Sequence, residues 1–149
     1  RMNTMQLAAS QIEPILHRLE LKAMGNYFMI DDAFNSNPVG AKNAVEILGA
    51  FSSVQRFIIT PGMVELGDIE AEENHKFGAY IAKAKLDFAF IVGLERGKVI
   101  EQGYLEAGGD PKRLERVESL FVANEKLKQH IKPGDVVLYE NDLPDIYNE

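Results

Sequence analysis

Two adjacent carboxylates, Asp31 and Asp32, stand between the apolar run 27–30 and a loop that contains Asn35 and Asn37. In α/β folds, ligands bind beyond the carboxyl ends of parallel strands, so a site is expected at this loop. Side chains alternate along a strand, so one carboxylate should face the site and the other the flank. A carboxylate there can hold ribose hydroxyls or a cation. The same residue types also favour turns and helix caps, and residue type alone leaves both interpretations open.

Two further groups could bind charged ligands. Arg18 carries five hydrogen-bond donors in a plane and could hold a phosphate or carboxylate in a bidentate manner. The alternative is a surface arginine that flanks a strand. The last apolar stretch is followed by Glu140, Asn141 and Asp142, at another strand end. These polar side chains matter if they face the same site, and the alternative is a solvated tail.

Several kinds of chemistry are not supported. The segment 60–67 is rich in turn residues but lacks the glycine spacing of phosphate-binding loops, so nothing here holds a triphosphate by itself. Glu70, Glu72 and Glu73 precede His75, but an acidic first turn stabilised by the helix dipole explains them without a metal. No nucleophile elbow is present. The sequence therefore predicts no metal site and no catalytic residue within this chain.

Composition narrows the class of protein. The 149 residues suffice for one domain with a hydrophobic core. No apolar run approaches the length of a membrane span, and the first residues do not resemble a secretory signal. The formal charge of -7 opposes binding to nucleic acid over a broad surface. The chain has no cysteine, which excludes thiolate chemistry and is compatible with a cytoplasmic location.

Six apolar stretches alternate with helical patterns, and the turn signal Met24-Gly25-Asn26 between the first two predicts an antiparallel hairpin. Such alternation implies right-handed crossovers between parallel strands. The prediction is an α/β, three-layer Rossmann-like domain, with a mostly parallel sheet of about six strands and an N-terminal antiparallel hairpin. The predicted strands are 18–22, 27–30, 56–60, 88–92, 117–121 and 136–139, and the predicted helices are 41–51, 71–85, 98–107 and 124–131.

Three segments together resemble the C-terminal domain of the Mur ligases. They are His17-Arg18-Leu19-Glu20, the run from Asp31 to Pro38, and Met63-Val64-Glu65-Leu66-Gly67 with His75 following. Mur ligases are ATP-dependent enzymes that add amino acids to the peptidoglycan precursor. The similarity assigns residues 17–149 to that domain and residues 1–16 to the tail of a preceding central domain or to a linker. The alternative interpretation of the first residue is a cloning remnant ahead of a natural Met2.

The resemblance implies a Rossmann-like domain that closes over a central ATPase domain. Arg18 would reach the nucleotide from across the cleft, and Asp32 would hold the ribose hydroxyls. Asn35 and Asn37 would shape the loop between nucleotide and incoming substrate. ATP and Mg²⁺ would be held mainly by domains absent from this chain, so the chain alone is expected to be inactive. The implied partners are a UDP-N-acetylmuramoyl-peptide, an incoming amino acid or dipeptide, and the N-terminal and central ligase domains.

The sequence departs from the family's pattern at one place that bears on the incoming substrate. Dipeptide-adding members of the family usually carry Lys-Gly-Ser after the last strand, where this chain reads Glu140-Asn141-Asp142. A lysine favours an anionic group, whereas carboxylates favour an amine or a cation. Glu140 and Asn141 are therefore predicted to bind the substrate, and a ligase that adds a different amino acid stays open. A free-standing Rossmann-like binding module is the second alternative.

Overall fold

The computed structural model describes residues 20–32, 37–64 and 66–140. The predicted tail 1–16 lies outside these ranges. Strands and helices alternate along the described chain, as the apolar pattern predicts. The strands are β1 Glu20–Met24, β2 Tyr27–Asp32, β3 Arg56–Thr60, β4 Phe88–Val92, β5 Leu114–Val117 and β6 Val136–Glu140; the α-helices are α2 Pro38–Ala50, α3 Glu70–Ala84, α4 Gly97–Glu106 and α5 Leu120–Lys128; the 3₁₀ turns are η1 Gly67–Ile69 and η2 Pro111–Arg113.

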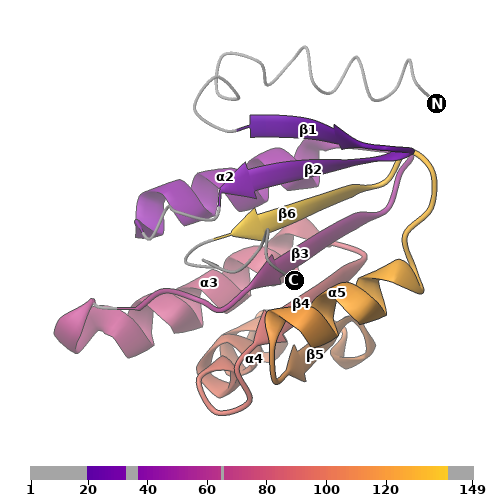
Figure 1. Ribbon diagram of the computed structural model, residues 1–149. Coiled ribbons are helices and arrows are strands. Elements are labelled where there is room, and N and C mark those ends of the chain that lie inside the picture. The colour runs from indigo at the N-terminus through magenta and orange to yellow at the C-terminus, as the bar shows by residue number, and fades with distance from the viewer. Residues whose placement is uncertain (1–19, 33–36, 65, 141–149) are drawn as a thin grey trace.

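The strands form one six-stranded sheet in the order β1-β2-β6-β3-β4-β5 (Figure 1). β1 pairs with β2 in the antiparallel direction, and every other neighbouring pair is parallel. Met24 pairs with Tyr27 across a two-residue turn, in which Gly25 has a φ of 77°. The predicted mostly parallel sheet with an N-terminal hairpin is therefore confirmed.

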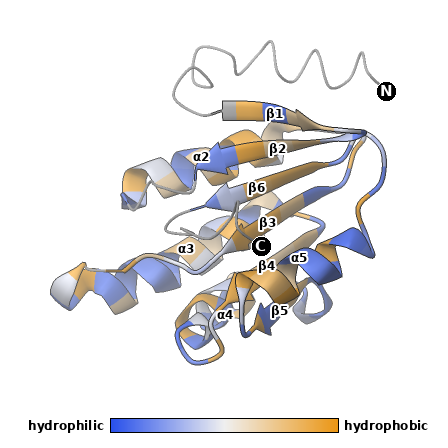
Figure 2. Cartoon of the chain, in the orientation of Figure 1, coloured by the Kyte–Doolittle hydropathy of each residue, from blue (hydrophilic) through white to orange (hydrophobic). Residues whose placement is uncertain are grey.

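Helices cover both faces of the sheet, which confirms the three predicted layers. α5 lies on the face toward the viewer in Figure 1, and α2 and α3 lie behind the sheet. Adjacent residues of β3 show the alternation: Ile58 packs into the cluster under α2, α3 and α4, and Ile59 packs against α5. β3 and β4 are almost continuously apolar (Figure 2), as expected for parallel strands buried on both faces. No helix within the described ranges is long and apolar enough to cross a membrane.

The predicted strand 117–121 is wrong except at Val117, because the strand lies earlier in the chain, at Leu114–Val117. β5 ends at Val117, and α5 begins at Leu120. The hydroxyl of Ser119 accepts a hydrogen bond of 3.1 Å from the backbone N–H of Val122, so Ser119 caps the helix. Leu120 and Phe121 are an apolar pair that suits a strand or a helix equally. Ser119 directly before them is a helix N-cap, and this cap favours the helix.

α3 and α4 cross at two glycines. A Cβ at Gly78 would lie 2.0 Å from the carbonyl oxygen of Ile100, and a Cβ at Gly103 would lie 1.9 Å from the carbonyl oxygen of His75. Both separations are far below a van der Waals contact, so the two backbones approach more closely than any side chain permits. This crossing fixes the position of α4 against α3.

Candidate functional site

Three buried polar residues form a row at the carboxyl ends of adjacent strands. Asp32 of β2 and Glu140 of β6 are register partners, and Thr60 continues the row at the end of β3. Residues two positions earlier on each strand pack beneath α2, α3 and α4, so the three side chains share that face. Asp32 is 9% exposed, and the other two have no exposed surface. The row lies at the edge where α/β sheets bind ligands.

The two adjacent carboxylates point to opposite faces of β2, as the alternation of a strand requires. Asp32 lies on the same face as Glu140, and Asp31 lies on the other. Lys22 of β1 donates to Asp31, with Nζ 3.4 Å from Oδ2. The structure thus places Asp32 in the polar row and Asp31 beside the hairpin strand.

The carboxyl of Glu140 is electrostatically unusual. Within the described part of the chain, no N–H or O–H group donates to either of its oxygens. Burial raises the pKa of Glu140 to about 11, and the hydrogen bond to Asp32 and the negative charge of Asp32 act in the same direction. Glu140 is therefore a neutral carboxylic acid at physiological pH. The structure gives it no exposed surface with which to contact a substrate directly.

Asn37 is the N-cap of α2. Its Oδ1 accepts hydrogen bonds from the backbone N–H groups of Val39 at 2.8 Å and Gly40 at 3.3 Å, and Pro38 begins the helix. This is the capping role that the sequence left open beside substrate binding. Asn37 therefore orients the start of α2 at the carboxyl edge of the sheet, whatever else its amide contacts.

Three of the predicted site residues cannot be placed. Arg18, Asn35 and Asn141 lie outside the described residues. Their predicted contacts with nucleotide and substrate therefore stay predictions.

Asn74 of α3 holds the loop after β3 and was missed by the sequence analysis. Its Oδ1 accepts from the backbone N–H of Met63 at 2.8 Å, and its Nδ2 donates to the carbonyl of Met63 at 2.9 Å. The side chain is buried, and a Cβ at Gly62 would lie 2.9 Å from its Oδ1. An asparagine on the same helix stripe as Phe77 and Ile81 was the available signal.

Replacing Asn74 by Leu is expected to lower the free energy of unfolding by about 2–4 kcal/mol, because two buried backbone groups of Met63 lose their partner. Urea denaturation followed by circular dichroism measures the change. Gln102→Leu is the matched control, since Gln102 is exposed and its amide donates to the exposed Glu106, at 3.0 Å. That control should change stability by less than about 0.5 kcal/mol. Equal losses in both variants would contradict the role of Asn74.

The acidic residues before His75 lie where the sequence predicts them. Glu70, Glu72 and Glu73 occupy the first turn of α3, where the helix dipole favours negative charge. His75 instead contacts α4, with Nε2 2.9 Å from Oε1 of Glu106. Across the ranges that the structure describes, no three His, Asp or Glu side chains are grouped to hold a metal ion.

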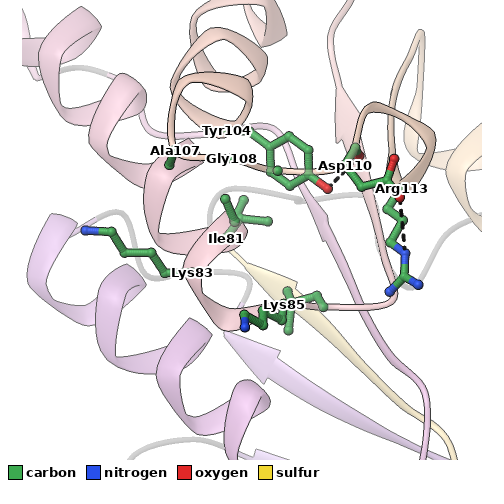
Figure 3. A pocket seen from close by; sticks show the side chains of 11 residues that line it. Ile81, Lys83, Lys85, Tyr104, Ala107, Gly108, Asp110 and Arg113 are labelled. Carbon is green, nitrogen blue, oxygen red and sulfur yellow. Dashed lines mark hydrogen bonds and ion pairs between the residues drawn. The ribbon is translucent and has the colours of Figure 1, made fainter.

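A cavity of about 480 Å³ lies at the opposite edge of the sheet (Figure 3). Lys85 and Leu86 precede β4, and Arg113 precedes β5, so these lining residues are at the amino ends of the strands. The Tyr104 hydroxyl donates to the carbonyl of Asp110 at 2.8 Å beside the cavity. This cavity is separate from the row of Asp32, Glu140 and Thr60, and it does not contribute to the candidate site.

The fold and the sequence together define the class of protein. The chain belongs to the Mur ligase family, because the family model described as "Mur ligase, glutamate ligase domain" matches residues 17–139. A curated relative is UDP-N-acetylmuramoyl-tripeptide--D-alanyl-D-alanine ligase from Bacillus subtilis (strain 168). It is 27% identical over 125 residues, which are 83% of this chain and 27% of the relative.

Solved structures show the same fold. The MurF ligase from Thermotoga maritima, in complex with ADP, superposes with a TM-score of 0.68 at 19% identity; the match covers 87% of this chain and 28% of that one. MurF from Acinetobacter baumannii gives a TM-score of 0.66 at 21% identity, over 84% of this chain and 26% of that one. The chain thus spans about a quarter of the length of the relatives that it matches.

Proposed function

We propose that the chain is the C-terminal, closing domain of an ATP-dependent amide ligase that acts on a peptidoglycan precursor. The observation that carries the proposal is Asp32, a carboxylate at the carboxyl end of a parallel strand in a domain of the Mur ligase family. The similarity to a D-alanyl-D-alanine ligase supports the same class of reaction. It does not favour the alternative of a free-standing binding module. The proposal places the enzyme in the cytoplasm, where ATP is available.

The described residues suit the nucleoside part of ATP better than its phosphates. The carboxylate of Asp32 can accept hydrogen bonds from both ribose hydroxyls. The sequence contains no glycine-rich phosphate loop. We therefore propose that Asp32 binds the ribose, that Arg18 reaches the nucleotide across the cleft, and that other domains hold Mg²⁺ and most of the phosphate contacts.

The carboxyl edge of the sheet also carries exposed apolar side chains. Within the described ranges six large apolar residues are exposed, and four of them follow the carboxyl ends of β2, β3, β4 and β5. Exposed apolar side chains are a feature of interaction surfaces. We propose that this edge faces the central ligase domain. The four residues are Val39, Ile69, Leu94 and Phe121.

The proposed reaction joins a carboxylate of the precursor to an amine. A precursor carboxylate oxygen attacks the γ-phosphorus of ATP, ADP leaves, and an acyl phosphate forms. The amine then attacks the carbonyl carbon, phosphate leaves with the bonding electron pair, and the nitrogen loses a proton. Asn35, Asn37 and Asn141 are proposed to border the incoming substrate. No step of this chemistry is assigned to a side chain of the described residues.

The identity of the incoming amino acid is a separate part of the proposal. A neutral, buried Glu140 supplies no positive charge where dipeptide-adding relatives usually carry a lysine. This favours an acceptor whose binding does not depend on a cation at that position. A ligase that adds a different amino acid is therefore the second candidate function.

The test is phosphate release by the complete gene product in the presence of ATP and Mg²⁺. UDP-N-acetylmuramoyl-tripeptide would be offered together with D-alanyl-D-alanine or with single amino acids of neutral, acidic and basic side chains. We expect release that requires both the precursor and one acceptor, with a new amide confirmed by mass spectrometry. No acceptor-dependent release with any member of the panel would contradict the ligase proposal. A gene product of this chain's own size would favour the binding module.

A further inference from the structure

The end of β6 holds a carboxyl group that simple packing does not explain. Glu140 has no exposed surface, and no N–H or O–H group of the described residues reaches its oxygens. Buried polar atoms normally have a hydrogen-bond partner, and an exception calls for a physical reason. An apolar side chain of similar length would fill the same space without this cost. The group therefore needs a role that an apolar residue could not serve.

Asp32, beside Glu140 in the sheet, gives the buried carboxyl group such a role. Asp32 is the register partner of Glu140 on the adjacent strand, and both side chains lie on the same face of the sheet. Asp32 raises the pKa of Glu140 through a hydrogen bond and through its negative charge, and two ionised carboxylates placed side by side would repel each other, so one proton is shared by the pair. Glu140 is the more deeply buried of the two, so the proton resides there. A buried acid kept neutral in this way can act as a hydrogen-bond donor.

We propose that Glu140 is a positioning residue, whose neutral carboxyl donates a hydrogen bond to Asp32 and holds that carboxylate in the orientation that binds the nucleotide ribose. The inference rests on the proposed function, because it takes Asp32 as the ribose ligand. It gives Glu140 an effect on binding through Asp32, without direct contact to a substrate. A carboxylate fixed before the ligand arrives loses less conformational freedom on binding.

The proposal predicts opposite effects on stability and on binding for one substitution. Glu140→Met fills the space but cannot donate a hydrogen bond, so the affinity of the complete gene product for ADP should fall about tenfold. At pH 8 the folded protein binds a proton at Glu140 that the unfolded chain has released, which costs stability. The melting temperature of Glu140→Met should therefore equal or exceed that of the wild type. A purely structural role predicts a lower melting temperature and unchanged affinity.

Glu140→Gln is the rescue variant, because its amide donates a hydrogen bond without titrating. We expect its affinity for ADP to stay within about threefold of the wild type. Calorimetric titration with ADP would compare the wild type, both Glu140 variants and Asp32→Asn. The inference is overturned if Glu140→Met binds ADP as the wild type does while Asp32→Asn binds weakly, or if Glu140→Gln is as weak as Glu140→Met. Normal binding by Asp32→Asn would instead overturn the ribose assignment, and with it this inference.

Infrared spectroscopy gives a second measurement that does not depend on the Met variant folding. The wild type at pH 8 should show the carbonyl stretch of a protonated carboxylic acid, which Glu140→Gln should lack. A wild-type spectrum without this band would show that no proton is held between Glu140 and Asp32. That result would also overturn the inference.

Discussion

Replacing Asp32 by Asn is expected to weaken ATP binding to the complete gene product by about 10- to 100-fold. The substitution preserves the size of the side chain and removes the negative charge that would accept hydrogen bonds from the ribose. A hydrogen bond to a charged group contributes roughly 1.5–3 kcal/mol, and each 1.4 kcal/mol is a factor of ten in affinity. Isothermal titration calorimetry with ATP measures the loss.

Asp31→Asn is the matched control, because Asp31 is the adjacent carboxylate on the opposite face of β2. Its effect on ATP affinity should be less than about twofold. A second comparison uses 2′-deoxyATP, which lacks one of the two hydroxyls. The wild type should prefer ATP, and Asp32→Asn should lose that preference. If the preference survives in Asp32→Asn, or if Asp31→Asn is equally weak, the ribose contact is wrongly assigned.

Replacing Gly78 by Ala is expected to destabilise the chain by about 3 kcal/mol or more. Alanine is a better helix former than glycine by roughly 0.8–1 kcal/mol, so helix propensity alone predicts a gain. The added methyl group, however, would lie 2.0 Å from the carbonyl oxygen of Ile100 and 2.8 Å from the backbone nitrogen of Tyr104. Neither is a flexible side chain that could move aside, so the helices must separate. In thermal unfolding followed by circular dichroism, the melting temperature should fall by roughly 10 °C.

Gly49→Ala is the control for this substitution, because Gly49 is also a helical glycine. The methyl group there would meet the Cβ of Ala84 at 3.2 Å, a side-chain contact that a small shift relieves. Its stability should stay within about 1 kcal/mol of the wild type. Similar melting temperatures for the two variants would show that α3 and α4 can separate without cost, contrary to the structure.

Features that depend on neighbouring residues could be predicted from the sequence. The hairpin followed from Met24-Gly25-Asn26, since a glycine in a two-residue turn is a local signal. The opposite orientations of Asp31 and Asp32 followed from the period of a strand. The apolar pair Leu120 and Phe121 has no distinctive period and predicts a strand, whereas the cap at Ser119 favours the helix that the structure shows.

Features that depend on residues far apart in the sequence could not be predicted in the same way. The contact between Asp32 and Glu140 exists because β6 lies beside β2, and no local pattern encodes the order of strands. The burial of Glu140 has the same origin, since the sequence alone was equally compatible with a solvated tail. Asn74 was missed because its partner is the backbone of Met63, which carries no residue-specific signal.

The central position of β6 has a consequence for how the protein is made. The ribosome synthesises β6 after the five other strands. In the folded sheet, however, β6 lies between β2 and β3 and pairs with both. Until it emerges, the hairpin of β1 and β2 has no partner strand, and two unpaired edges are open to other chains. Nascent chains are therefore most vulnerable to aggregation just before translation of this segment ends. The insertion of β6 completes the sheet and brings Glu140 to Asp32 in one event, so folding and assembly of the candidate site finish together.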